Sequence, residues 1–553
     1  MDRPWLTSYP DGVNSDIDIH QYNSLVEIFE HSVELYANLP AFSNFGTTIS
    51  YAEFSDATES VAAYLQNKLG LEKGERVAIM MPNLLQNPVS IFGVLRAGLT
   101  VVNTNPLYTV RELHHQLKDS GAKAIIVVEN YASTVQAAVT DTDIEHIIVT
   151  KMGDMLNFPK SILINWAVKY LKKMVPSYTL PNAISFKTVL SEGSNQDFVP
   201  TPLSHHDIAF LQYTGGTTGV AKGAMLSHKN MVANMLQASE WIKNDVLPGR
   251  EAIITALPLY HIFSLTANCL VFMEAGANNI LITNPRDFKG FVKELSNTPF
   301  TAITGVNTLF NALINTPGFA DIDFTQLKIS LGGGMSVQPA VAAQWKKITG
   351  CTLVEAFGLT ETSPAVCINP LNLEEFNGSI GLPIPSTYCK LINDQGDTLP
   401  DGKAGELCVK GPQVMQGYWN RPEDTAEVLS NDGWFKTGDV AKMDGNGFFY
   451  IVDRIKDMIL VSGFNVYPNE IESVIVEHKG VLECGVIGVP DDLRGEAVKA
   501  FVVKKDQSLT ESELLAHCRK SLTAYKTPDK IVFIHELPKT NVGKVLRREL
   551  RSL

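Results

Sequence analysis

The sequence predicts an α/β protein: a large N-terminal body of two α/β subdomains plus a small β-rich subdomain, then a small C-terminal α/β domain. Three observations predict this fold class. Apolar runs of strand length alternate with amphipathic helical segments over most of the chain, short alternating runs punctuated by glycine and proline begin near Gly378, and a compact helix-and-strand unit follows Asp453. Strands that alternate with helices indicate parallel sheets with helices on their faces.

The composition is that of a soluble globular protein with about two to four domains. The chain has 553 residues, of which 45% are hydrophobic and 19% charged. Its net charge of −13 argues against a nucleic-acid partner. Seven cysteines without a C-x-x-C pair, an N-terminus unlike a signal peptide and the lack of a membrane-length apolar run predict a cytoplasmic protein.

The first α/β subdomain is predicted from local patterns. Ser24 and Glu27 fit a capping box that opens a helix at residues 24–38. Strands are then predicted at 76–80, 99–102 and 124–128, with helices at 84–96 and 111–119 between them. Because ligands of such sheets bind at the carboxyl ends of the strands, the loops that follow the strands are the expected place for chemistry.

A basic segment, residues 159–176, then interrupts the alternation. It holds four lysines and no acidic residue. Its apolar residues recur on one side of a helix at Leu163, Trp166, Tyr170 and Met174. Such a helix suits an anionic membrane surface, and it equally suits packing on its own domain. Both interpretations stay open.

Residues 213–222, Y-T-G-G-T-T-G-V-A-K, follow a predicted buried strand at 208–211. Glycines let backbone N–H groups approach an anion, hydroxyls add donors, and Lys222 supplies a positive charge. The spacing matches neither the Walker pattern nor G-x-G-x-x-G. These residues therefore predict a phosphate-binding loop of a third kind. Its candidate ligands are Tyr213, Thr214, Gly215, Gly216, Thr217, Thr218, Gly219 and Lys222.

The second α/β subdomain and the two smaller units follow in order. Strands are predicted at 252–257, 279–282, 302–304, 328–331 and 353–354, a helix at 339–349, and a helix or strand at 270–274. In the β-rich subdomain, residues 444–447 (D-G-N-G) predict a hairpin turn. In the C-terminal domain, a helix around Ile471, strands at 481–489 and 497–503, and a capping box at 510–513 are predicted.

Three further motifs carry polar groups suited to a nucleotide. In A-F-G-L-T-E, Phe357 can stack on a base and Glu361 can hold a hard cation beside phosphates. In T-G-D, expected at a strand end near a turn, Asp439 can accept from ribose hydroxyls, or it can belong to an ordinary surface hairpin. Lys544, in N-V-G-K near the C-terminus, follows a glycine and precedes the basic pair Arg547 and Arg548, so that by itself it favours a solvated basic tail.

Taken in order, these motifs resemble the adenylate-forming superfamily, which comprises acyl-CoA synthetases, amino-acid adenylation domains and luciferases. The resemblance rests on the phosphate loop, F-G-L-T-E, T-G-D, D-R-I-K-D, S-G-F-N-V-Y-P and N-V-G-K-V, and it covers nearly the whole chain. Within the superfamily, the chain is most similar to the bacterial long-chain fatty acid–CoA ligases. The resemblance implies ATP and Mg²⁺ as cofactors and CoA as co-substrate.

The resemblance also implies a role for each motif at the nucleotide. The loop up to Lys222 would close over the ATP phosphates, Thr214 and Glu361 would hold Mg²⁺, and Phe357 would stack on adenine. Asp439 and Arg454 would bind the ribose. The remaining expected nucleotide-site residues are Gly333, Gly334, Gly358, Thr360 and Lys456.

By the same resemblance, residues 1–453 form the ATP- and acyl-binding body and residues 454–553 form a mobile lid that turns at Asp453. Lys544 would bridge the acid's carboxylate and the α-phosphate, offsetting the repulsion between them as charge builds in the transition state. Gly463 would approach the pantetheine thiol. The expected catalytic residues are Lys544, His261 and Glu361.

His261 is either a core histidine at a strand end or, by resemblance, a residue at the mouth of the acyl pocket. Amino-acid-activating members place an aspartate at the position of Ser264, and no acid occurs at 257–269. A substrate without an amino group is therefore indicated, and Ile262 and Phe263 would suit an alkyl chain.

The expected function is a ligase that forms a fatty acyl adenylate and then a thioester with CoA. Two alternatives remain: an adenylate-forming enzyme for a different carboxylic acid, and a membrane-associated fatty-acid uptake or binding protein. The expected partners are a long-chain fatty acid and CoA. Peripheral contact with the inner face of the membrane and a homodimer are left open.

Overall fold

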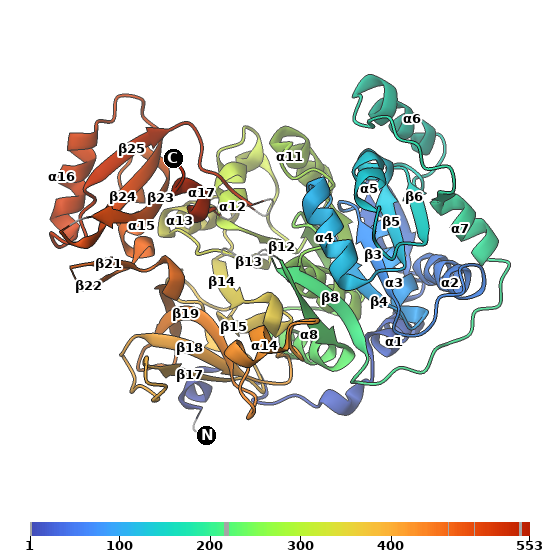
Figure 1. Ribbon diagram of the computed structural model, residues 1–553, viewed down its shortest axis with the longest axis horizontal. Helices are drawn as coiled ribbons and strands as arrows, with labels where there is room; N and C mark the ends of the chain where they lie inside the picture. Colours follow the sequence, from blue (N-terminus) through green and yellow to red (C-terminus); the bar gives the residue numbers. More distant parts are fainter. Residues whose placement is uncertain (1–2, 215–220, 463, 492, 541–542, 544) are drawn as a thin grey trace.

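The computed structural model describes residues 3–214, 221–462, 464–491, 493–540, 543 and 545–553. Within these residues the chain forms four β-sheets with helices packed on them, and the C-terminal sheet lies at one end of the molecule (Figure 1). The predicted α/β fold class is confirmed. Most predicted strands and helices are present within one or two residues of their expected bounds.

The first sheet is parallel except at one edge, in the order β7-β6-β5-β3-β4-β8-β9. Its strands are β3 (Arg76–Met80), β4 (Thr100–Asn103), β5 (Ala124–Val128), β6 (His146–Thr150), β7 (Ile184–Ser185), β8 (Ile208–Thr214) and β9 (Lys222–Ser227). Its helices are α2 (Tyr51–Asn67), α3 (Gln86–Arg96), α4 (Val110–Ser120), α5 (Ala132–Ala138) and α7 (Phe186–Gly193). The antiparallel pair β8–β9 brackets the predicted phosphate loop.

The second sheet has the order β16-β15-β14-β13-β12-β10-β11-β1-β2. Its strands are β1 (Pro40–Asn44), β2 (Thr47–Ser50), β10 (Ala252–Thr255), β11 (Asn278–Leu281), β12 (Ala302–Gly305), β13 (Ile329–Gly332), β14 (Leu353–Gly358), β15 (Ala365–Ile368) and β16 (Leu382–Pro383). The accompanying helices are α1 (Leu25–Tyr36), α8 (His228–Ile242), α9 (Ile262–Ser264), α10 (Val271–Glu274), α11 (Phe288–Asn297), α12 (Asn307–Ile314) and α13 (Pro339–Thr349). The N-terminal hairpin β1–β2 thus belongs to this sheet, which sequence patterns did not predict.

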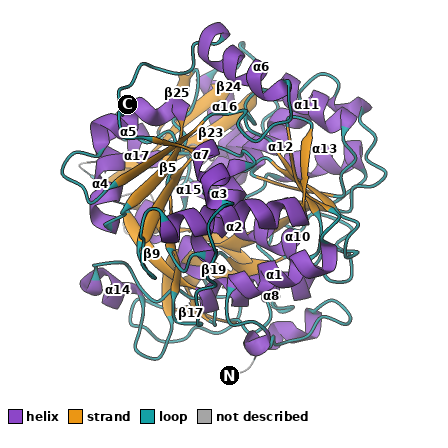
Figure 2. Cartoon of the chain, turned by 90° about the vertical axis from the view of Figure 1, so that its right-hand side faces the viewer, coloured by secondary structure: helices purple, strands orange, loops and turns teal. Residues whose placement is uncertain are grey.

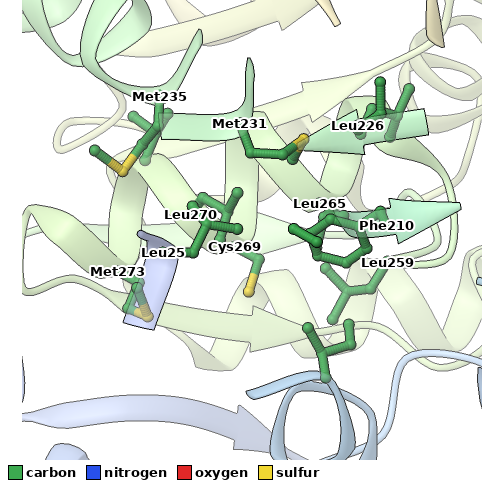
Figure 3. Close-up of a cluster of buried hydrophobic side chains, with 14 of the residues drawn as sticks. Leu25, Phe210, Leu226, Met231, Met235, Leu259, Leu265, Cys269, Leu270 and Met273 are labelled. Carbon is green, nitrogen blue, oxygen red and sulfur yellow. The ribbon is translucent and has the colours of Figure 1, made fainter. Parts of the chain in front are cut away.

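One hydrophobic core joins the two sheets. Figure 3 shows part of it, where Phe210 of β8 and Leu226 of β9 lie near Met231 of α8 and Leu265 of the π-helical turn η5 (Leu265–Leu270). Figure 2 views the end of the body where α1, α2 and α3 lie over the sheets. The two α/β subdomains are therefore packed as one body.

The β-rich subdomain is an antiparallel meander of β17 (Tyr388–Ile392), β18 (Gly405–Lys410), β19 (Phe435–Met443) and β20 (Phe449–Arg454), with α14 (Pro422–Val428) beside it. The predicted turn at 444–447 joins β19 to β20 and is confirmed. The T-G-D motif, expected at a strand end, lies inside β19 instead. Gly438 has a φ of +73°, a conformation that glycine tolerates at the irregularity between the paired strands.

The C-terminal unit has a sheet of its own. It comprises β21 (Ile459–Val461), β22 (Phe464–Val466), β23 (Val481–Asp491), β24 (Gly495–Lys504) and β25 (Lys530–Ile534), with α15 (Pro468–Val476), α16 (Glu511–Ser521) and α17 (Arg547–Leu550). Two apolar clusters within the unit, centred on Ile471 and Phe501, include no residue of the body. A separate core is what an independent domain requires.

The basic segment forms the predicted helix, as α6 (Lys160–Trp166) and the π-helical turn η4 (Ala167–Leu171), which project from the body (Figure 1). Its apolar side faces solvent: Leu163, Trp166 and Tyr170 are 60%, 54% and 62% exposed. Among the described residues, none of the helices combines the length and apolar character needed to cross a bilayer.

Candidate active site

A cleft of about 2490 Å³ lies between the body and the C-terminal unit. It collects the described residues that the sequence motifs singled out. They are Tyr213, Thr214, Lys222, His261, Gly333, Gly334, Phe357, Gly358, Thr360, Glu361, Asp439, Arg454 and Lys456. The other predicted site residues, Gly215, Gly216, Thr217, Thr218, Gly219, Gly463 and Lys544, lie outside the described residues.

The predicted phosphate loop joins two strands of one sheet, because Thr214 and Lys222 are paired across the antiparallel β8–β9 hairpin. Walker loops instead join a strand to a helix, which accounts for the different spacing. Lys222 forms an ion pair with Asp424, and its Nζ atom lies 5.3 Å from the centroid of the Tyr418 ring. Lys222, the first residue of β9 after the loop, is therefore in a position to bind an anion held by the loop.

The Tyr213 hydroxyl is hydrogen-bonded within the protein. It donates a hydrogen bond of 2.7 Å to Asp119 Oδ2 at the end of α4, and burial raises the pKa of the Tyr213 phenol. Tyr213 therefore fixes the hairpin against the helix that covers it.

Glu361 supplies a carboxylate beside the hairpin. It lies in the short 3₁₀ helix η7 (Thr360–Thr362), which follows β14 and contacts both β8 and β9. Its Oε1 atom accepts a 2.7 Å hydrogen bond from the Tyr418 hydroxyl. Within the described residues no cluster of three or more His, Cys, Asp or Glu residues could cage a metal. One carboxylate plus hydroxyl oxygens fits Mg²⁺, which in such sites is shared with substrate phosphates.

The ends of β13 and β14 meet at the cleft, where these parallel strands pair Gly332 with Glu355. A Cβ atom at Gly333 would approach the Phe263 ring to 3.0 Å, and one at Gly358 would approach Pro364 O to 2.0 Å. Gly358 therefore requires glycine, whereas a Cβ atom at Gly333 would need the Phe263 ring to shift slightly. The strand β14 runs on to Gly358, further than the predicted 353–354, and so carries Phe357 into the cleft.

Glu355 also lines the cleft and was not singled out from the sequence. Its side chain is buried, and burial raises its pKa to about 8, although the Val337 N–H donates to it at 3.2 Å. A carboxyl group that keeps its proton near neutral pH can donate a hydrogen bond to a ligand.

Asp439 and Arg454 face each other across the β19–β20 pair. Arg454 Nε donates to Asp439 Oδ1 at 3.0 Å, and the Asp439 side chain is buried. Lys456 follows in the turn η8 (Ile455–Asp457); burial, and then the charge of Arg454, lower its pKa. The Asp439 carboxylate thus lies near the positive charges of Arg454 and Lys456, at the point where the body ends.

A buried ionic network ties this point to the C-terminal unit. Arg547 NH1 lies 3.3 Å from Asp453 Oδ1 and 3.2 Å from Asp457 Oδ2, and Arg547 NH2 lies 2.9 Å from Glu472 Oε2. The Asn469 N–H, at the start of α15, donates to Asp453 Oδ2 at 2.8 Å. Burial raises the pKa of Asp453 to about 6, although Arg547 acts in the opposite direction.

His261 opens the short helix α9, where its Nδ1 atom accepts from the Phe263 N–H at 3.3 Å. Ser264 is buried and donates to Leu257 O at 2.7 Å, so this position carries no charge toward the cleft. The apolar part of the cleft is lined by Ala238, Ile242, Val271, Phe272, Leu331 and Ile368.

A two-sheet α/β body and a small C-terminal unit, with a cleft between them that collects the sequence motifs, are the architecture of an adenylate-forming enzyme. The chain belongs to the AMP-binding enzyme family. The family model of the AMP-binding enzyme matches residues 29–419, and the model of the AMP-binding enzyme C-terminal domain matches residues 470–544.

Curated and solved relatives agree with this assignment. A long-chain-fatty-acid–CoA ligase of Escherichia coli O6:H1 is 57% identical over all of this chain and 98% of its own length. The anthranilate CoA ligase AuaEII, solved with anthranoyl-AMP, has a TM-score of 0.86 at 26% identity over 97% of this chain and 98% of its own. ATP-bound MatB of Rhodopseudomonas palustris has a TM-score of 0.79 at 28% identity over 96% and 99%.

Proposed function

We propose that the protein is a long-chain fatty acid–CoA ligase. It joins ATP and the fatty acid to give acyl-AMP and pyrophosphate, and then passes the acyl group to the CoA thiol with release of AMP. The observation that carries the proposal is the 57% identity to the Escherichia coli ligase, which extends over the whole chain. The described candidate residues for nucleotide binding line one cleft, which supports the proposal.

In the first step, one set of residues is proposed to bind ATP and Mg²⁺, and Lys544 is proposed to stabilise the transition state. The hairpin loop and Lys222 hold the phosphates, and Thr214 and Glu361 hold Mg²⁺, which supplies positive charge against the phosphate oxygens. Phe357 stacks on adenine and Asp439 binds the ribose hydroxyls. Gly333, Gly334, Gly358 and Thr360 leave room for the nucleotide and position it.

Lys544 is the proposed catalytic lysine. The attack of a carboxylate on the α-phosphate brings two anions together, and a positioned ammonium group offsets that repulsion most as charge builds in the transition state. The thiol step needs other contacts, because its nucleophile and leaving group differ. We therefore propose that residues 454–553 turn as a lid on the body, residues 1–453, with Asp453 at the hinge and Gly463 near the thiol.

The acyl chain is proposed to occupy the apolar part of the cleft. His261 is proposed to lie at the entrance of this apolar part, beside the carboxylate of the fatty acid. Buried Ser264, which donates to a backbone carbonyl, offers no anion to an amino group, so an alkyl acid suits the pocket better than an amino acid. Ala238 and Ile242 of α8 lie one turn apart on the face that lines it.

The decisive experiment is ATP–pyrophosphate exchange across a series of carboxylic acids, followed by detection of the CoA thioester. Activity is expected to rise well past about eight carbons, since each buried CH₂ contributes about 0.8 kcal/mol. A maximum at acetate or at an aryl acid would overturn the long-chain assignment. Exchange without thioester formation from free CoA would point to another adenylating activity.

We further propose that the basic segment touches the inner face of the membrane. Its exposed apolar side chains, Leu163, Trp166 and Tyr170, lie beside the exposed Lys169 and Lys172. This combination suits insertion at an anionic interface. An amphipathic helix that packed on its own domain would instead bury the apolar side.

A further inference from the structure

We propose that Tyr418 is a positioning residue for the Glu361 carboxylate, and that the segment of residues 416–425 builds the phosphate and metal site from the β-rich subdomain. The inference rests on the proposed role of Glu361 in holding Mg²⁺. It assigns a function to a stretch, Q-G-Y-W-N-R-P-E-D-T, that no sequence motif singled out.

The 416–425 segment is attached to β9 of the phosphate hairpin through an isolated β-bridge. The Met225 N–H donates to Gly417 O at 2.9 Å, and the Trp419 N–H donates to Gly223 O at 2.8 Å. Residues Ala224 and Tyr418 form an antiparallel bridge between them. The backbone of Tyr418 is therefore registered to the strand that begins at Lys222.

Its side chains are anchored to the same helix as the hairpin. Arg421 NH2 donates to Asp119 Oδ1 at 3.0 Å, and Trp419 Nε1 donates to Asp119 O at 3.1 Å. Asp119 Oδ2 accepts from the Tyr213 hydroxyl at 2.7 Å. One residue at the end of α4 thus holds both the hairpin and the segment, which fixes their relative positions.

The Tyr418 side chain extends from this anchored backbone to the Glu361 carboxylate, the proposed metal ligand. This side chain is 9% exposed, and its hydroxyl donates to Glu361 Oε1 at 2.7 Å. A donor at Oε1 restrains the carboxylate and leaves Oε2 as the oxygen that can face a cation. Hydrogen bonds of this kind orient metal ligands.

The same segment also contacts the cation of the site. Asp424 forms an ion pair with Lys222, and Lys222 Nζ lies over the Tyr418 ring at 5.3 Å. Both charged groups expected at the phosphates, Glu361 and Lys222, are therefore held from one ten-residue stretch. A residue that merely packed in the core would not touch both.

The test is Tyr418→Phe, which removes the hydroxyl and keeps the ring. The measured quantity is the metal coupling of nucleotide binding, defined as the dissociation constant of metal-free ATP divided by that of MgATP, by calorimetry without fatty acid. We expect this ratio to fall about 10–100-fold from its wild-type value, with metal-free ATP binding unchanged. The matched control is Tyr9→Phe, whose hydroxyl donates to Pro383 O and which does not line the cleft.

A kinetic arm separates positioning from folding. In Tyr418→Phe, the Mg²⁺ concentration for half-maximal adenylate formation should rise, whereas thioester formation from supplied acyl adenylate should match wild type. An unchanged coupling ratio, or an equal loss in both half-reactions together with a lower Tm, would overturn the assignment. If the wild-type protein formed no acyl adenylate, the proposed function would fail, while the binding ratio would still judge the role of Tyr418.

Discussion

Removal of Arg547 should loosen the C-terminal unit through the carboxylates that it neutralises. In Arg547→Met, Asp453, which is fully buried, loses its cation while Asp457 and Glu472 stay nearby. Breaking a buried pair from one side costs about 3–5 kcal/mol. The two other carboxylates are partly exposed, so we expect the lower end, about 3 kcal/mol, or on the order of a 100-fold loss of amide protection.

Hydrogen exchange of α15 is the assay, because the Asn469 N–H at its start is bonded to Asp453. Amides of α8, in the body, serve as the internal control. The double variant Arg547→Met with Asp453→Asn removes the buried charge together with its partner and should recover most of the protection. A double variant no better than the single one would refute the electrostatic reasoning.

The loss of amide protection in Arg547→Met should also depend on pH, because Asp453 titrates. Burial raises the folded-state pKa of Asp453 to about 6, above the value of 3.8 for an exposed aspartate. The folded state therefore binds the proton more tightly, and the cost of the charge is present above pH 6 and falls away below it. Without Arg547 this pKa rises further. The loss of protection in Arg547→Met should shrink between pH 8 and pH 5, after correction for intrinsic exchange.

Three further outcomes are expected. Lys544→Ala should abolish adenylate formation yet leave thioester formation from supplied acyl adenylate largely intact; equal loss of both would contradict its assigned role. Charge reversal at Lys169, Lys172 and Lys173 should reduce co-sedimentation with anionic vesicles but not with zwitterionic ones. Charge reversal at Lys289 and Lys293 on α11, the control, should change neither. Identical sedimentation of all variants would mean that the basic segment is a packing helix. Ala238→Phe should fill the apolar part of the cleft and lower kcat/KM for long acids by about 10-fold or more while sparing short ones, since side-chain volume there competes with buried CH₂ groups; an unchanged chain-length profile would move the acyl chain elsewhere.

Local patterns predicted the elements whose signal is local. The strand at 124–128 and the helix at 339–349 agree with β5 and α13, because an apolar run and a proline at the first helical turn are each complete within a few residues. The hairpin β1–β2 escaped prediction because its place in the second sheet depends on the pairing of Phe42 with Asn279. No pattern within residues 40–50 specifies so distant a partner.

The site shows the same division. Motifs with glycines, hydroxyls and charges at fixed spacing led to Thr214, Lys222 and Glu361, and the described members of these motifs line one cleft. Tyr418 and Asp424 were missed because their importance lies in what they touch. The available signal was the placement of polar side chains in a glycine- and proline-bounded loop, which is also the composition of ordinary turns.

The pairing of Phe42 with Asn279 also has a consequence during synthesis of the chain. The two residues are separated by 279 − 42 = 237 positions, which a ribosome covers in about 12–47 s at 5–20 residues per second. Through that interval β1 and β2 have only each other as partners in this sheet, and an isolated two-stranded hairpin is marginally stable in water. The nascent N-terminal strand therefore has an unpaired edge until β11 has emerged, and the body can close its second sheet only after half of the protein has been made.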